Sequence, residues 1–193
     1  DKAAAFSTYG HIKDWNVTGV TNMQHAFLDK TAFDEDISGW DVSNVTNMKH
    51  MFKNASSFNQ PIGIWNVSSV IEMTSMFKNA SSFNQAIVDW NTSSVTNMGH
   101  MFWGSAINQN LEGWNLSSAT NLTDMFKTTS ALSNAYKGLI HSSFSSNSNW
   151  PYDWSAFVNT PPPNQTGDNN QTAPPPDNPT AFYRPIPKAL AAQ

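Results

Sequence analysis

The chain contains no cysteine among its 193 residues, which excludes disulfide bonds, thiolate zinc ligands and cysteine nucleophiles. Charged side chains make up only 12% of the sequence, with 10 Lys+Arg against 14 Asp+Glu. A nucleic-acid-binding face needs a cluster of basic residues, so we expect no nucleic-acid partner. No apolar run approaches the roughly 20 residues that a membrane-spanning helix needs, so we expect no membrane span in this chain.

The chain begins at Asp1, with neither a methionine nor an apolar leader segment. We expect either that a secretory or lipoprotein leader has been removed or that the chain is a fragment of a longer protein. Its polarity comes mainly from Asn, Ser and Thr, which predicts a surface rich in hydrogen-bonding groups and poor in charge.

The main feature present is an internal repeat. The segment WDVSNVTNMKHMFKNASSFNQPIGI, residues 40–64, recurs about five times at a spacing of 25 residues, or 24 after the fourth copy. The copies begin at Trp15, Trp40, Trp65, Trp90 and Trp114. A unit of this size cannot bury its apolar face alone, so the copies are expected to stack and share a core. This pattern predicts the display of a regular surface rather than a single chemical pocket.

The apolar residues within each copy predict its secondary structure. Val45, Met48, Phe52 and Ala55 have the three-and-four spacing of a helical face. In residues 60–65, which lead to the next Trp, β-branched residues alternate with small or polar ones, as in a short strand. We therefore predict an α/β repeat solenoid, leucine-rich-repeat-like, with a short helix and a short parallel strand in each coil.

The ends of such a solenoid expose apolar surface and need caps. We expect an N-terminal cap in residues 1–14, the five repeats in 15–130, and a C-terminal cap in 131–158 that combines a helix with an aromatic plug. Two Pro-Pro-Pro runs predict an extended linker over 159–181, followed by a tail of unknown role over 182–193.

The string W-(D/N)-V-S-x-V-T-N-M-x-x-M-F-x-x-A-x-x-F-N-Q-x-I resembles the repeat of the BspA-like leucine-rich-repeat group of bacterial surface proteins. The resemblance covers residues 12–127, and residues 132–157 resemble the segment that often closes such arrays. Thr92 in place of Val and Ala26 in place of Met depart from the string. The resemblance implies an extracellular, surface-attached protein with a binding role, and it indicates the architecture better than the ligand.

Two sets of tryptophans are candidates for contact with a ligand. The Trp that opens each copy is either an exposed platform for sugar rings or a buried ladder with hydrogen-bonded indole N–H groups. Its recurrence beside Ile and Val favours burial. Trp103 differs, because the same position holds Lys53, Lys78 and Lys127 in other copies. We predict that Trp103, with Lys53 and Lys78, contributes to a binding face.

His25, His50 and His100 share one position of the repeat, and Ser75 interrupts the column. We expect His25 and His50 to lie about 5 Å apart on adjacent coils, which is compatible with a bridged metal ion. A zinc site needs three or four ligands, so a solvated pair is favoured and the three histidines are assigned to the binding face. The run Asp34-Glu35-Asp36 is either a calcium site or, as we favour, a solvated acidic edge.

Asparagine and glutamine also recur at fixed positions, most clearly in the Asn-Gln pairs at 59–60, 84–85 and 108–109. Side-chain amides satisfy backbone groups well where a chain turns, so we expect them at the corners of the coils. The repeat generates many N-x-S/T sequons, which are therefore poor evidence for glycosylation.

No Ser/His/Asp arrangement, pair of catalytic carboxylates or phosphate-binding glycine loop stands out, so we expect neither an enzyme nor a cofactor or metal. The function predicted is an extracellular adhesion-type module that recognises a protein or glycan on another cell or matrix through the solenoid face. The alternative is a structural subunit of a fibre, appendage or virion, which would assemble with sister subunits through the solenoid ends or the tail. Repeat scaffolds host unrelated activities, so the fold does not choose between them.

Overall fold

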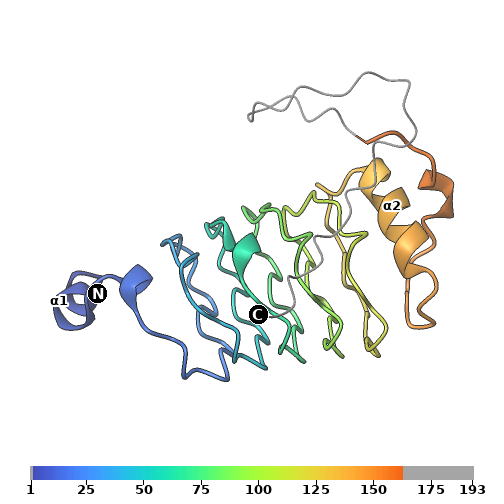
Figure 1. Cartoon of the computed structure of the whole chain (residues 1–193). Helices are drawn as coiled ribbons and strands as arrows, with labels where there is room; N and C mark the ends of the chain where they lie inside the picture. Colours follow the sequence, from blue (N-terminus) through green and yellow to red (C-terminus); the bar gives the residue numbers. More distant parts are fainter. Residues whose placement is uncertain (1, 163–193) are drawn as a thin grey trace, which may run out of the picture. The chain divides into compact units, whose positions relative to one another are not determined.

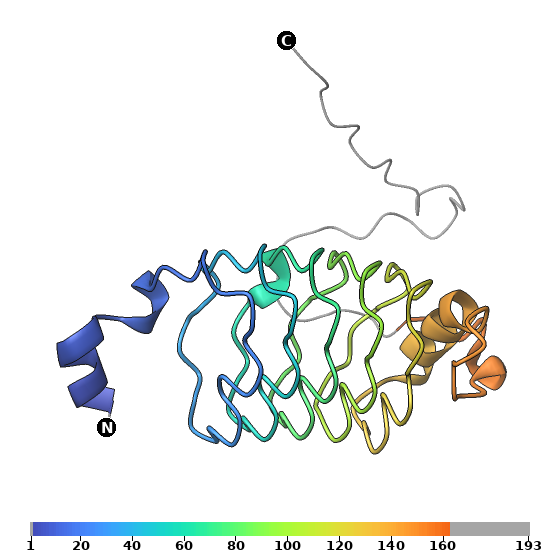
Figure 2. The same ribbon diagram turned by 90° about the horizontal axis from the view of Figure 1, so that it is seen from below.

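The computed structural model describes residues 2–162. Within these residues, two α-helices occur, α1 over Lys2–Tyr9 and α2 over Asn134–Phe144. Three short 3-10 helices occur as well: η1 over Ile12–Asp14, η2 over Ile62–Ile64 and η3 over Ser155–Phe157. Between α1 and α2 the repeats form loops that stack side by side (Figures 1 and 2). The predicted tail, and the predicted linker beyond residue 162, lie outside the described residues.

The prediction of an α/β, leucine-rich-repeat-like solenoid is wrong. Residues 2–162 contain no β-strand, and the repeats are connected only by isolated parallel bridges. The bridges join Asn22 to Asn47, Asn47 to Glu72, Glu72 to Asn97 and Asn97 to Asn121. The segment predicted as a strand before Trp65 instead contains the 3-10 helix η2.

A succession of hydrogen-bonded turns replaces the predicted helix. In the second repeat, Met51 N–H donates to Met48 O at 3.1 Å and Ala55 N–H to Phe52 O at 3.0 Å, both three residues back rather than four. His50 and Asn54 have φ of 58° and 61°, which an α-helix does not contain. Each precedes the donor residue of its turn, where a type II turn requires positive φ. Turns and a helix both place apolar residues three and four apart on one side, so the spacing did not distinguish them.

The positive φ values recur in every repeat. One set comprises His25, His50, Ser75, His100 and Asp124, here called the histidine column. The other comprises Asp29, Asn54, Asn79, Gly104 and Thr128. Asn and Asp tolerate this conformation because their short polar side chains hydrogen-bond locally, and Gly adopts it without steric cost.

Hydrogen bonds between consecutive repeats all point the same way along this turn segment. Between the first two repeats, the N–H groups of Met23, His25, Phe27 and Asp29 donate to the carbonyls of Asn47, Lys49, Met51 and Lys53 at 2.9–3.1 Å. The equivalent four bonds recur at each later step of the stack. At these four positions the earlier repeat is the donor, so the peptide groups align in columns that polarise one another. The later repeat donates in return just before this segment, where Thr46 N–H donates to Thr21 O at 2.8 Å beside a parallel bridge.

The core consists of aromatic columns that run through the repeats. Phe27, Phe52, Phe77, Phe102 and Phe126 stack with centroids 5.4–5.8 Å apart. The repeat-opening Trp residues line the same core, and burial is confirmed for four of the five. The indole Nε1 of Trp65, for example, donates to the carbonyl of Ile37 at 3.2 Å. Trp15 is the exception, with 41% of its surface exposed.

The two ends of the stack differ. After the last repeat, Trp150 and Trp154 pack on Phe126, and the Tyr152 hydroxyl accepts the Phe126 N–H at 2.8 Å. At the other end, a cleft of about 940 Å³ lies between the first repeat and the segment of α1 and η1. Its aromatic lining includes Phe6, Trp15, Phe27 and Phe33. Among the described residues, no helix is both long and apolar enough to cross a membrane.

Candidate functional site

The histidine column and a neighbouring lysine column form a strip on the outside of the stack. The lysine column comprises Leu28, Lys53, Lys78, Trp103 and Lys127, one from each repeat. The two columns together are called the polar strip. In the second repeat, Met48, Met51 and Phe52 point into the core. The neighbouring residues His50 and Lys53 are therefore only partly buried. The sequence-predicted site residues all belong to this strip.

His25 and His50 are in direct contact. His25 Nε2 lies 2.9 Å from His50 Nδ1, and the rings stack with centroids 5.0 Å apart, as the sequence predicts. Such a bond needs one ring to donate and the other to accept, so it exists only while at least one ring is neutral. Burial lowers the pKa of His50, and the charges of Lys53, His25 and Lys49 lower it further while Glu72 opposes them. No group of three potential metal ligands exists among the described residues.

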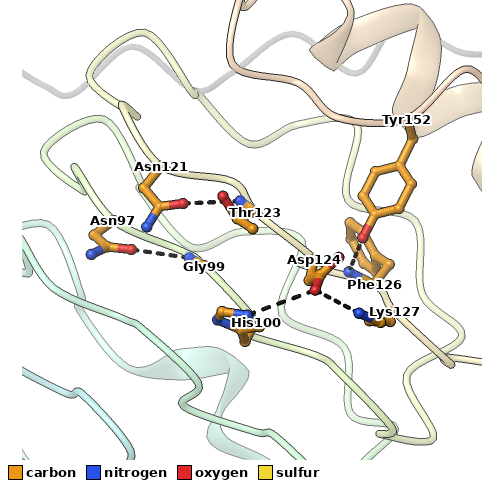
Figure 3. Close-up of polar contacts among 9 residues, drawn as sticks. All are labelled: Asn97, Gly99, His100, Asn121, Thr123, Asp124, Phe126, Lys127 and Tyr152. Atoms are coloured by element: carbon orange, nitrogen blue, oxygen red, sulfur yellow. Dashed lines mark hydrogen bonds and ion pairs between the residues drawn. The ribbon is translucent and has the colours of Figure 1, made fainter.

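His100 belongs to a second cluster, in the fourth and fifth repeats (Figure 3). Its Nε2 lies 3.8 Å from Asp124 Oδ2, and the same oxygen accepts the Lys127 ammonium at 2.9 Å. The turns that carry His100 and Asp124 are held by side-chain amides. Asn97 Oδ1 accepts the Gly99 N–H, and Asn121 Oδ1 accepts the Thr123 N–H, both at 3.0 Å.

Trp103 lies between two cations. The Lys78 ammonium, from the preceding repeat, is 3.8 Å from the ring centroid, and the Lys127 ammonium, from the following repeat, is 4.5 Å away. His100 stacks beside the indole at 5.3 Å. Each cation–π contact contributes about 0.5–1 kcal/mol at an exposed site. The indole faces are therefore occupied, and a sugar ring could stack on them only after displacing a lysine.

A model of one protein family matches the chain over residues 1–106 and again over 60–160. The family is described as "Mycoplasma protein of unknown function, DUF285". The chain belongs to this family. The two matches overlap and together span all five repeats. Comparison with curated proteins and with solved structures gave no match.

In this DUF285 chain the predicted site residues form two groups rather than one. His25, His50 and Lys53 lie in the first two repeats, and Lys78, His100 and Trp103 lie in the third and fourth. Between the groups, the histidine column holds Ser75, which is buried with 5% of its surface exposed. Sequence reasoning did not select Asp124 and Lys127 for the site. Asp124 shares the repeat position of His100, and Lys127 shares that of Trp103. These shared positions were the signal in the sequence that could have added both residues to the site.

The amide side chains of this DUF285 repeat act as the sequence predicts. Asn84 Oδ1 accepts the backbone N–H of Asn108 at 2.7 Å, and Gln85 Nε2 donates to Asn59 O at 2.8 Å. These bonds connect the corners of neighbouring repeats. They account for the recurrence of Asn-Gln as a structural device rather than as a binding site.

The acidic run of the first repeat takes part in the same system. Asp34 Oδ1 accepts both the N–H of Asn59 and Nε2 of Gln60 at 2.9 Å. The Ser38 hydroxyl and then its N–H donate to Asp36 and lower the pKa of that exposed carboxyl. These carboxylates therefore stabilise turns and corners at the surface.

Proposed function

We propose that this protein is a non-enzymatic binding module that recognises a macromolecule, protein or glycan, through the polar strip. The proposal is supported by the different roles of the residues within each repeat. Trp, Met and Phe columns bury the core, and amides and peptide groups connect the repeats. Lys53, Lys78 and Trp103 make none of the side-chain hydrogen bonds that hold the stack, so their recurrence on one side points to contact with a partner.

The proposed location is the cell surface or the extracellular space. It rests on the resemblance of the repeat to the BspA-like group, whose members are bacterial surface proteins. The low content of charged residues, 12%, suits an exposed protein that binds through a defined face rather than by general ionic attraction. This location and the BspA-like affiliation belong to the proposal together.

The test is capture of partners on arrays of glycans and of matrix proteins. The protein is compared with Lys53→Ala/Lys78→Ala, which alters the strip, and with Lys13→Ala/Lys137→Ala, which makes the same change in net charge elsewhere. We expect the strip variant to lose captured partners and the control to keep them. Equal capture by both variants, or no capture by the unaltered protein, would contradict the proposal.

The alternative function is a structural subunit, and the open cleft beside the first repeat favours it. The hydrogen-bond direction limits this alternative. Along the turn segment the first repeat would offer carbonyls to a preceding neighbour, so two such segments would meet acceptor to acceptor. The donor end is covered, because Tyr152 and Trp154 pack on Phe126. Light scattering that shows a monomer at high concentration would exclude assembly through the ends.

A further inference from the structure

Opposite charges are separated around the repeat. Lys49, Lys53, Lys78 and Lys127 lie in or next to the polar strip. Most carboxylates of the repeats, namely Asp34, Glu35, Asp36, Asp41, Asp89 and Glu112, lie at the opposite end of the repeat sequence, around the Trp that opens each copy. In and next to the strip, lysines therefore outnumber the carboxylates Asp29, Glu72 and Asp124, although the chain has a net charge of −4. Separation of this kind attracts an anionic partner to one face.

Few carboxylates neutralise the strip from within. Asp124 pairs with Lys127 at 2.9 Å, and Glu72 accepts the Thr74 N–H at 2.7 Å. Lys53 and Lys78 form no ion pair with any carboxylate of residues 2–162. Their ammonium groups are therefore available to an external anion.

Trp103 holds two of the cations in place. Its ring attracts the ammonium groups of Lys78 and Lys127 from the two neighbouring repeats. A free lysine side chain loses conformational entropy when it binds an anion. Lys78 and Lys127 have already lost part of this entropy through their contacts with Trp103, so binding costs less. Because the cations cover the indole, a ligand meets charge rather than an aromatic platform.

The spacing of the strip favours a polysaccharide over an acidic peptide. The lysine column advances one residue per repeat, and the neighbouring phenylalanine column advances 5.4–5.8 Å per repeat. Side chains on one face of an extended peptide are about 6.8 Å apart, so they fall out of register over several repeats. An acidic pyranose chain has a step per ring comparable with one repeat, and rotation about its glycosidic bonds can turn the acidic group of each ring toward the strip.

We infer that the polar strip binds an acidic polysaccharide, with its carboxylate or sulfate groups on Lys53 and Lys78. The inference rests on the proposed function and specifies the ligand class for the same face. The chain would lie along the stack, and Trp103 would act by positioning the two lysines that flank it.

The test uses titration calorimetry of the full chain with dextran sulfate, polygalacturonate, neutral dextran and poly-L-glutamate. We expect binding to both acidic polysaccharides, none to neutral dextran, and an affinity that falls as salt rises. Lys53→Gln/Lys78→Gln should weaken binding about tenfold, whereas Lys13→Gln/Lys137→Gln, with the same net charge, should change it by less than about twofold. Lys53→Arg/Lys78→Arg should retain binding, and thermal melts check the fold of each variant.

Each contrary result has a distinct meaning. Equal weakening in the two Gln variants, or poly-L-glutamate binding as tightly as dextran sulfate, would overturn the inference. If neither dextran sulfate nor polygalacturonate binds, the inference is overturned too. The proposed function would still stand if the arrays show capture that depends on Lys53 and Lys78. Trp103→Leu keeps the charge and removes both cation–π contacts, so we expect about threefold weaker binding. Unchanged affinity in Trp103→Leu would exclude the positioning role.

Discussion

His25 Nε2 and His50 Nδ1 lie 2.9 Å apart across the boundary between the first two repeats. The contact couples the junction to proton uptake, because full protonation of both rings removes the acceptor. His50 is also surrounded by Lys49 and Lys53, with Glu72 as the opposing charge. Protonation of His50 therefore adds a positive charge beside these two lysines.

The first prediction concerns stability against pH. The pKa of His50 is lowered from the ordinary value of 6.5, mainly by burial. The unfolded chain therefore binds a proton more readily, and the stability linked to His50 is complete above about pH 6.5 and is lost as the pH falls through the folded-state pKa. We expect the melting temperature to fall between pH 7 and 5, and to fall less in His50→Gln. His11→Gln, at an exposed histidine, is the control and should show the same pH dependence of the melting temperature as the unaltered protein. The same dependence in His50→Gln as well would contradict the prediction.

The second prediction concerns the tryptophan ladder. Trp65 is 4% exposed and donates its indole N–H to Ile37 O at 3.2 Å. Trp65→Phe removes one of the two hydrogen bonds that Ile37 O accepts, the other coming from the Trp40 N–H, and leaves space in the core. We therefore expect a loss of about 1–3 kcal/mol in the free energy of unfolding. Trp15→Phe is the matched control, because Trp15 is 41% exposed. Urea denaturation measures both, and similar losses would show that the ladder has no special role.

The third prediction concerns the phenylalanine column. Phe77 is fully buried and stacks on Phe52 and Phe102 in the adjacent repeats and on Phe83 in its own. Phe77→Ala should therefore cost about 3–5 kcal/mol in the free energy of unfolding. The same truncation at Phe6, which is 52% exposed, should cost well under 1 kcal/mol. Because each repeat contacts only its neighbours, loss of the middle ring should also broaden the unfolding transition.

The sequence predicted the stacking of like residues better than it predicted the backbone. Met48 and Phe52 were expected to face inward and both are fully buried, because burial depends on the apolar spacing alone. The helix was wrong because His50 and Asn54 take positive φ, and neither residue type demands it. Asp, Asn or Gly at five of the ten equivalent positions was the only local signal of turns.

The site shows a similar limit. The pairing of His25 with His50 was predictable, since one repeat separates them and the stack sets their distance. The enclosure of Trp103 by Lys78 and Lys127 was not, because it depends on how long side chains of neighbouring repeats lie across the surface. From the sequence, a single Trp in a lysine column was interpreted as a residue that contacts a ligand. In the structure its ring contacts the two neighbouring lysines instead.

The fourth prediction concerns Gly104, which follows Trp103 and has φ of +69°. A Cβ at this residue would lie 2.6 Å from Asn79 Oδ1, so an alanine meets both backbone strain and a steric clash. We expect Gly104→Ala to lower the free energy of unfolding by about 1–2 kcal/mol. Gly19→Ala, where a Cβ meets no atom within 4 Å, is the matched control and should change little. Urea denaturation of the two variants measures the difference.

Since Gly104 N–H donates to Lys127 O at 3.0 Å, Gly104→Ala should also disturb the turn that places Trp103 between its lysines. A stable Gly104→Ala protein with unchanged dextran sulfate affinity would show that this turn tolerates a side chain.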